Sequence, residues 1–265
     1  MSKKFLVVGN PIEHSLSPKL HSYWMKKNNI DAVYESRLIK EDELKKIVLE
    51  LREDKINGAN ITLPFKKTII PFLDELSTEA KISYSVNTIY KKKNKIVGDN
   101  TDIFGFQTSL KNVNQVVKNK KVFILGAGGV VSSIIIALKK LGALKIFISN
   151  RTDLQALELK KKFPGIEVIT WGKTIDFDVI INATSLGLNE KDEINLNYEK
   201  ISKGKFFYDV IYNPKETNFL RQAKKFGAKV ENGKMMFVYQ AQKAFLIWHN
   251  ILPLADDETV NLLDT

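Results

Sequence analysis

Short apolar segments alternate with amphipathic segments along the first hundred residues. Residues 5–9 (FLVVG) and 59–62 (ANIT) are apolar runs typical of buried strands, and residues 32–38 (AVYESRL) alternate as a half-buried strand does. Residues 41–53 (EDELKKIVLELRE) carry apolar side chains at helical spacing. Strands separated by helices predict an α/β unit with a mostly parallel sheet.

Proline and turn residues predict further elements in this half. Ser17 precedes a proline, which predicts an N-cap and a helix running to about Asn28. Pro64 is placed to start another helix. Segments 87–92 (NTIYKK) and 95–100 (KIVGDN) are expected to form two strands joined by a Lys-Asn turn.

A second α/β unit is predicted to begin near Asn119. Residues 121–152 indicate a strand, a Gly-rich turn, a helix and a strand, which make one βαβ unit. A helix around residues 102–112 is expected to join the two units. Further strands are expected at 167–170, 177–183 and 206–212, helices at 154–163 and 217–227, and helical structure from Gly233 to the end.

The amino-acid composition excludes several kinds of functional site. The chain has 265 residues, no Cys and three His. The missing Cys excludes disulfides, Cys-ligated metals and a cysteine nucleophile, and so few His leave little material for a metal site; no metal is expected. The N-terminal apolar run is too short for a signal peptide, and no run reaches the roughly 18 apolar residues of a membrane span. A soluble, cytoplasmic protein is expected.

The chain is basic, with 41 Lys and Arg against 30 Asp and Glu and a net charge of +11. Only residues 91–93 form a tight Lys run, at an expected hairpin turn. Because no RNA-binding strand motif, zinc-finger spacing or leucine zipper is present, nucleic acid is not an expected partner. A membrane is not an expected partner either. A solvated basic surface is favoured, and the monomer and the homodimer both stay open.

The Gly-rich turn at residues 126–129 (GAGG) has the position of a dinucleotide fingerprint. Gly126 permits a tight turn, and Gly128 lets the backbone approach a pyrophosphate at a helix N-terminus. The third fingerprint position is Val131, so the match is partial, and a purely structural turn is the alternative.

The end of the next strand reads Asn150-Arg151-Thr152, where an NAD site usually has a carboxylate. Arg151 with amide and hydroxyl neighbours suits a 2′-phosphate, which favours NADP over NAD. Thr152 as an ordinary helix cap is the alternative interpretation.

Three motifs in the first half are candidates for chemistry. Ser15 and Ser17 lie beside a helix start and could hold a carboxylate, although Ser17 alone reads as an N-cap. Lys66 is predicted in a first helical turn, where the helix dipole disfavours a cation, so it is either surface or a proton donor. Asp102 stands at another predicted helix start, with a plain cap as the alternative.

Taken together, these motifs form an ordered series that covers essentially the whole chain. The chain resembles the shikimate dehydrogenase family in the strings GNPIEHSLSPKLH, NITLPFKK, SVNT, GDNTDIFGF, GAGG, NRT, NATSLG, DVIYNP and QAQKAFLIWH. Each motif alone is modest, whereas the ordered set is highly specific. Val131, Ser132, Ser22 and Asn232 depart from the family's usual residues, and the missing basic residue at Ser132 is expected to weaken binding of the cofactor phosphate.

The resemblance implies roles for individual residues. It makes Lys66 and Asp102 the catalytic pair. The implied substrate-binding residues are Ser15, Ser17, Thr62, Lys66, Asn87, Asp102, Tyr212 and Gln240. The implied NADP-binding residues are Gly126, Ala127, Gly128, Gly129, Asn150, Arg151 and Thr152, with Thr184 and Ser185 nearby and with Gly233 and Met236 lining the nicotinamide.

The resemblance also implies an architecture and a reaction. A discontinuous substrate-binding catalytic domain of residues 1–104 and 235–265 is expected, with a Rossmann-like NADP-binding domain at 105–234 and the ligands in a cleft between them. The implied reaction is NADPH-dependent, reversible reduction of 3-dehydroshikimate to shikimate in aromatic amino acid and chorismate biosynthesis. Two alternatives stay open: a quinate/shikimate dehydrogenase with NAD or mixed cofactor use, and a non-catalytic nucleotide-sensing module on the same fold.

Overall fold

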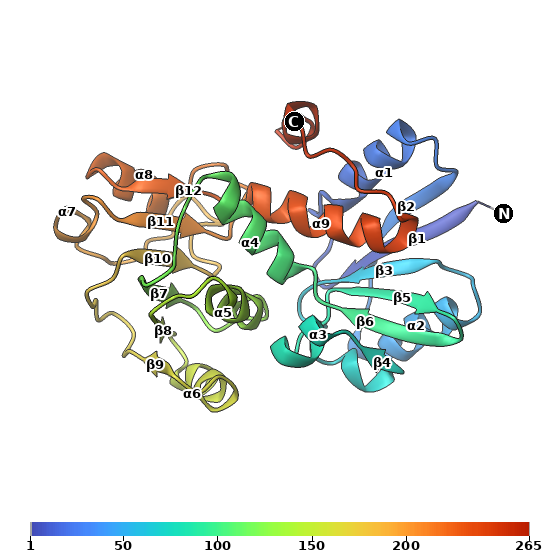
Figure 1. Cartoon of the computed structure of the whole chain (residues 1–265), viewed down its shortest axis with the longest axis horizontal. Helices are drawn as coiled ribbons and strands as arrows, with labels where there is room; N and C mark the ends of the chain where they lie inside the picture. Colours follow the sequence, from blue (N-terminus) through green and yellow to red (C-terminus); the bar gives the residue numbers. More distant parts are fainter. Residues whose placement is uncertain (1, 265) are drawn as a thin grey trace. The chain divides into compact units, whose positions relative to one another are not determined.

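The computed structural model describes residues 2–264, which divide into two compact units (Figure 1). The first unit is Met1–Gly105 with Val238–Thr265, and the second is Phe106–Phe237. Each unit is built on its own six-stranded sheet. The expected class of two α/β domains with a Rossmann-like second sheet is confirmed, and the first sheet is mixed, with three of its five strand pairs parallel.

The first unit contains most of its elements in the N-terminal part of the chain. They are β1 (Lys3–Gly9), α1 (Ser17–Lys27), β2 (Ala32–Leu38), η1 (Glu41–Glu43), α2 (Leu44–Arg52), β3 (Gly58–Ile61), η2 (Ile70–Phe72), β4 (Glu75–Leu76), α3 (Thr78–Ser83), β5 (Thr88–Lys92) and β6 (Lys95–Asp99), with α4 (Asp102–Asn112) leading out and α9 (Lys234–His249) and α10 (Asp257–Leu262) at the end.

The first sheet has the order β2-β1-β3-β5-β6-β4. β5 is antiparallel to both neighbours, β3 and β6, and the other three pairs are parallel. The carboxyl ends of β3 and β6 therefore lie at the same sheet edge as the amino end of β5. The loops that leave this edge carry several of the candidate site residues.

The side chains of β1 point alternately to the two faces of this sheet, and both faces are covered by helices. Leu6 and Val8 belong to a core cluster with the apolar side of α2, including Leu44 and Ile47. Phe5 points to the other face, where its ring lies 5.0 Å from that of Trp248 in α9. A strand buried on both faces reads as a continuous apolar run, which explains why FLVVG shows no polar alternation.

The second unit holds the remaining elements. They are β7 (Lys121–Leu125), α5 (Val131–Lys140), β8 (Lys145–Ser149), α6 (Asp153–Lys162), β9 (Ile166–Val168), β10 (Val179–Asn182), α7 (Tyr198–Ile201), β11 (Phe206–Asp209), α8 (Asn218–Lys225) and β12 (Lys229–Glu231). All strand pairs are parallel, in the order β12-β11-β10-β7-β8-β9 (Figure 1). The strand order reverses between β7 and β10, which is the topological switch point where such sheets bind ligands.

Two local predictions in the first unit are wrong. Residues 63–69 form successive turns rather than a helix beginning at Pro64, so Lys66 does not lie at a helix start. Ser17 is the first residue of α1 rather than its N-cap, and its backbone N–H donates to Ser15 Oγ at 3.3 Å. The Ser17 hydroxyl instead bonds to the phenol of Tyr34, a tertiary contact that a local cap rule does not include.

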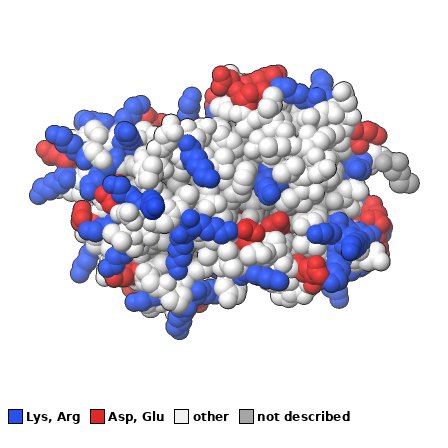
Figure 2. Space-filling model, viewed as in Figure 1, with Lys and Arg blue, Asp and Glu red and all other residues white. Residues whose placement is uncertain are grey.

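Charged side chains of both signs lie on the surface. Lys and Arg side chains are scattered over the face drawn in Figure 2, with Asp and Glu between them. Within residues 2–264, none of the helices combines the length and apolar character that crossing a membrane requires.

Candidate active site

Lys66 and Asp102 form a nearly buried ion pair in the first unit. Lys66 Nζ lies 2.6 Å from Asp102 Oδ2, and the two side chains are only 12% and 7% exposed. Charges that are largely shielded from water interact more strongly than surface charges, and they hold one geometry better. The two residues are thus suited to present an ammonium group at a defined position.

Backbone hydrogen bonds at the sheet edge explain how residues 36 positions apart meet. The Val86 N–H donates to Lys66 O at 2.8 Å, so the turn after β3 is tied to the segment before β5. The Asn87 N–H donates to Asp99 O at 3.0 Å, so this segment is tied to the end of β6. Asp102 begins α4 directly after that strand end.

Asn87 connects the pair to a fourth candidate residue. Its Nδ2 donates to Asp102 Oδ1 at 2.9 Å and to Gln240 Oε1, in α9, at 3.4 Å. The structure therefore brings Lys66, Asn87, Asp102 and Gln240 together in one hydrogen-bonded cluster. This cluster offers donors and acceptors suited to a polyhydroxylated ligand.

Ser15, Ser17 and Thr62 lie in loops that leave the same sheet. The Thr62 N–H donates to Val8 O at 2.9 Å, so Thr62 sits where β3 ends beside β1. Ser15 and Ser17 follow β1, with Ser15 half-buried and Ser17 buried. Since β1 and β3 are parallel neighbours, both loops start from one edge.

The glycine turn of the second unit lies between β7 and α5, at the switch point. Gly126 has a φ of +109°, and a Cβ there would lie 2.6 Å from Ala183 O, so a larger residue would be strained and would clash. A Cβ on Gly128 would meet no atom within 4 Å. The turn is thus packed tightly on one side and open at Gly128.

The three residues after β8, Asn150 to Thr152, differ in the hydrogen bonds that they form. The Asn150 Nδ2 donates to Thr152 O at 2.8 Å and to Gln155 Oε1 at 3.1 Å. Thr152 occupies the N-cap position of α6, but its side chain makes no capping hydrogen bond. Arg151 is exposed and forms no hydrogen bond or ion pair with other residues of the 2–264 range. Its guanidinium is available to an external anion.

A buried carboxyl group organises the loops after β10 and β11. Asp209 accepts hydrogen bonds from Asn182 Nδ2, the Ile211 N–H and the Thr217 hydroxyl, at 2.7 to 3.0 Å. Burial raises the pKa of Asp209 to about 6. Asn182 Oδ1 in turn accepts from the Thr184 hydroxyl at 2.7 Å, which orders the loop that carries Thr184 and Ser185. Sequence reasoning missed Asp209, although it opens the quoted DVIYNP motif.

Three further candidates lie close to the start of α9 in the second unit. A Cβ on Gly233 would come within 2.1 Å of Val210 O, so only glycine fits there. The ring of Tyr212 stacks on that of Phe237 with centroids 4.8 Å apart, and burial raises the pKa of Tyr212. Met236 is buried.

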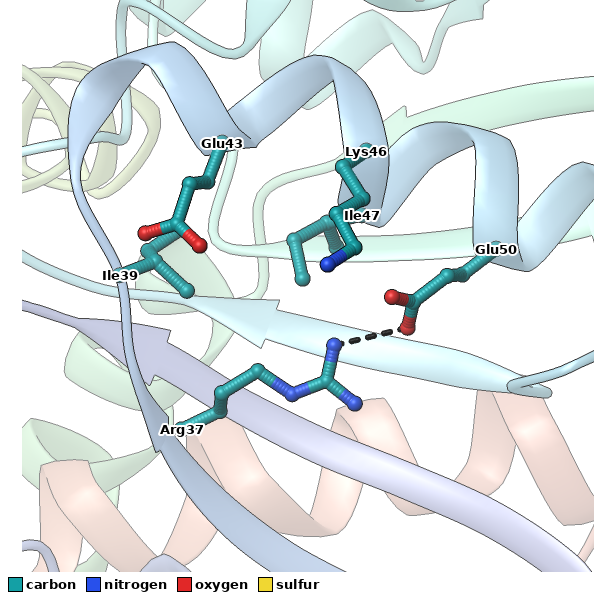
Figure 3. Close-up of a pocket in the computed structure, with 6 residues that line it drawn as sticks. All are labelled: Arg37, Ile39, Glu43, Lys46, Ile47 and Glu50. Atoms are coloured by element: carbon teal, nitrogen blue, oxygen red, sulfur yellow. Dashed lines mark hydrogen bonds and ion pairs between the residues drawn. The ribbon is translucent and has the colours of Figure 1, made fainter.

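A hollow in the first unit lies apart from all these residues. It has a volume of about 240 Å³ and is lined by Arg37, Ile39, Glu43, Lys46, Ile47 and Glu50 (Figure 3). Arg37 Nη1 and Glu50 Oε2 form an ion pair across it at 2.7 Å, so the charge of the Arg37 guanidinium is already balanced by a carboxylate. No candidate site residue lines this hollow.

One unit has an all-parallel sheet with a glycine turn at its switch point, and the other holds a Lys–carboxylate pair; a chain with both features falls in the class of nicotinamide-dependent dehydrogenases. Family models place the chain further: residues 7–89 match the shikimate dehydrogenase substrate binding domain, and residues 108–216 match shikimate / quinate 5-dehydrogenase. The chain belongs to the shikimate dehydrogenase (NADP+) family, which confirms the resemblance drawn from the ordered motifs.

Individual relatives agree with this assignment. A shikimate dehydrogenase (NADP(+)) of Pelagibacter ubique is 69% identical over 264 residues, covering 100% of both chains. The crystal structure of shikimate dehydrogenase from Aquifex aeolicus has a TM-score of 0.90 at 38% identity, covering 98% of this chain and 96% of that one. The Thermus thermophilus enzyme, solved with NADP(H) and shikimate, has a TM-score of 0.88 at 32% identity, with 97% of each chain covered.

Proposed function

We propose that this chain catalyses the reversible, NADPH-dependent reduction of 3-dehydroshikimate to shikimate, a step of aromatic amino acid and chorismate biosynthesis. The observation that carries the proposal is the nearly buried Lys66–Asp102 pair, held within a cluster of hydroxyl-binding groups. The names of the relatives support the same substrate and cofactor.

Reduction of the ring ketone requires a hydride and a proton. Nicotinamide, when bound, supplies the hydride. Lys66 Nζ then donates the proton to the ketone oxygen as the alcohol forms, and it takes the proton back in the reverse direction. Asp102 Oδ2, 2.6 Å from Nζ, keeps the ammonium group in position and balances its charge.

The remaining candidates of the first unit position the substrate in this proposal. Ser15 and Ser17 are proposed to hold the carboxylate through their hydroxyl groups, for which the Ser17 hydrogen turns from Tyr34 to the ligand, and Thr62 assists from the neighbouring loop. Asn87, Asp102 and Gln240 bind the ring hydroxyls, which supports catalysis by fixing the ketone relative to Lys66. Tyr212, which belongs to the second unit, remains a proposed substrate-binding residue.

The second unit fits an NADP cofactor. The open side of Gly128 allows close approach of a pyrophosphate, while the tight packing of Gly126 requires the glycine that the fingerprint supplies. Arg151 stands at the end of β8, where its guanidinium can bind a 2′-phosphate with Asn150 and Thr152 beside it. Gly233 and Met236 are proposed to line the nicotinamide, and Thr184 and Ser185 are proposed to contact the cofactor nearby. We therefore propose a substrate-binding domain of residues 1–104 and 235–265 and an NADP-binding domain of residues 105–234.

The central test is a spectrophotometric assay of the purified chain. NADPH absorbance is expected to fall when 3-dehydroshikimate is added, and NADP+ is expected to be reduced when shikimate is added. Parallel reactions with NADH and with quinate separate this function from a quinate/shikimate dehydrogenase. If no combination supported turnover, a nucleotide-sensing role would replace the proposal.

Arg151→Ala is expected to raise the KM for NADPH by about 10- to 100-fold, the effect of losing charge-assisted hydrogen bonds to a phosphate. The KM for NADH should change little, because NADH lacks the 2′-phosphate. Steady-state rates with both cofactors measure this difference. Arg221→Ala, which removes an exposed Arg in α8, is the matched control. Equal increases for NADPH and NADH would refute the assignment of Arg151.

A cytoplasmic location and a monomeric or homodimeric state complete the proposal, with neither nucleic acid nor membrane as partner. Size-exclusion chromatography with light scattering distinguishes the two oligomeric states.

A further inference from the structure

A chain of buried polar side chains extends from the candidate active site into the first sheet. Tyr34, Asn60 and Thr88 are all buried, and none of them has a role in the proposal above. The Tyr34 hydroxyl donates to Asn60 Oδ1 at 2.6 Å, and Asn60 Nδ2 donates to Thr88 Oγ1 at 3.0 Å. The chain then continues to Asn87, whose carboxamide contacts Asp102.

A backbone donor sets the orientation of the Asn87 carboxamide. The Thr101 N–H, which can only donate, lies 2.8 Å from Asn87 Oδ1. The oxygen of the carboxamide therefore faces Thr101, and Nδ2 faces Asp102 Oδ1 at 2.9 Å. A rotated carboxamide would place its oxygen against the Asp102 carboxylate, so the correct orientation matters for the Lys66–Asp102 pair.

A backbone acceptor sets the direction of the Thr88 hydroxyl in the same way. Asn87 O can only accept, and Asn60 Nδ2 donates to it at 3.0 Å. The Asn60 nitrogen therefore also faces Thr88 and donates to Thr88 Oγ1. The hydroxyl hydrogen of Thr88 remains for Asn87 Oδ1 at 3.2 Å, which is closer than Thr101 Oγ1 at 3.4 Å. The Thr101 hydroxyl also lies 3.2 Å from Asn87 Oδ1, and it accepts from Asn87 Nδ2 at 2.9 Å.

We propose that Thr88 is a positioning residue for the dehydrogenase reaction, since its hydroxyl, as a second donor beside the Thr101 N–H, helps to hold the Asn87 carboxamide in the orientation that presents Nδ2 to Asp102. The inference rests on the proposed function of the Lys66–Asp102 pair. Thr88 itself touches neither reacting group; it acts through Asn87. Because Thr88 is paired with Asn60 in the sheet register, the fold places its hydroxyl at this point.

The test is Thr88→Val, which keeps the shape of the side chain and removes the hydroxyl group. We expect kcat for shikimate oxidation to fall about tenfold, as for loss of one buried hydrogen bond. The KM for NADP+ is expected to stay unchanged. Thr88→Ser restores the hydroxyl and is expected to return kcat to near the wild-type value. Thr88→Ala removes the same hydroxyl without the branched side chain and serves if Thr88→Val does not fold.

Thr259→Val is the matched control for loss of a buried threonine hydroxyl. Thr259 is fully buried in the first unit and bonds to Leu254 O and Asp256 Oδ1, far along the chain from the cluster. It should lower thermal stability and leave kcat intact. A wild-type kcat in a folded Thr88→Val or Thr88→Ala variant would overturn the inference, as would a Thr88→Ser variant as slow as Thr88→Val. Absence of shikimate oxidation by the wild-type chain would instead overturn the proposed function.

Discussion

Lys66→Met is expected to lower kcat about 1000-fold in both directions, the size of effect typical of removing a positioned general acid–base group. Methionine keeps most of the side-chain length but cannot donate or accept the proton at Nζ. The KM for NADPH should change little, because Lys66 belongs to the first unit and the proposed cofactor residues to the second. Steady-state rates of NADPH oxidation measure both constants.

Lys91→Met is the matched control for Lys66→Met. Lys91 Nζ also forms an ion pair of 2.6 Å, with Asp54, but Asp54 is 68% exposed and the pair lies on the surface of the first unit. This variant should keep wild-type kcat. If Lys66→Met retained more than a tenth of the wild-type kcat while Lys91→Met was unaffected, another group would have to supply the proton.

Asp102→Asn is expected to lower kcat about 100-fold and also to destabilise the fold. The substitution leaves the Lys66 ammonium group nearly buried without its counter-charge, and removing one partner of such a pair costs about 3 kcal/mol of unfolding free energy. The amide also presents a donor to either Lys66 or Asn87, both of which already donate to Asp102. Steady-state kinetics and urea unfolding at one pH measure the two effects.

Asp54→Asn separates these effects from simple loss of a carboxylate. It breaks an ion pair of the same length at the surface, where such pairs contribute little, so kcat and the unfolding free energy should stay close to wild type. An Asp102→Asn variant that was slow but fully stable would contradict the paired, nearly buried geometry. One that was unstable but fully active would contradict the catalytic role.

Elements with strong periodicity were predictable from the sequence. The helix expected at 102–112 is observed as α4, Asp102–Asn112, and the strands expected at 87–92 and 95–100 are observed as the antiparallel β5 and β6. Short elements were missed, including β4 (Glu75–Leu76) and α7 (Tyr198–Ile201). Two to four residues are too few to show a period, so their backbone state depends on neighbouring elements.

Local rules failed where tertiary contacts compete with them. Pro64 is compatible with a helix start, yet residues 63–69 turn repeatedly because Lys66 O accepts from the Val86 N–H of a segment twenty positions later. Ser17 fits the pattern of an N-cap, yet its hydroxyl bonds to Tyr34. The Lys66 carbonyl is thus used by a residue distant in sequence, and the Ser17 hydroxyl has a partner outside its own helix.

The sequence by itself determined the family, because nine motifs in fixed order identify it without any geometry, and it determined the α/β class through its periodic segments. Only the tertiary structure decided that Lys66, Asn87, Asp102 and Gln240 share one hydrogen-bonded cluster, and in which direction each bond runs. The physical reason is that strand order and the antiparallel insertion of β5 between β3 and β6 set the contacts of Lys66, Asn87 and Asp102, while α9 brings in Gln240 from much later in the chain. Neither feature is encoded in the residues next to the motifs themselves.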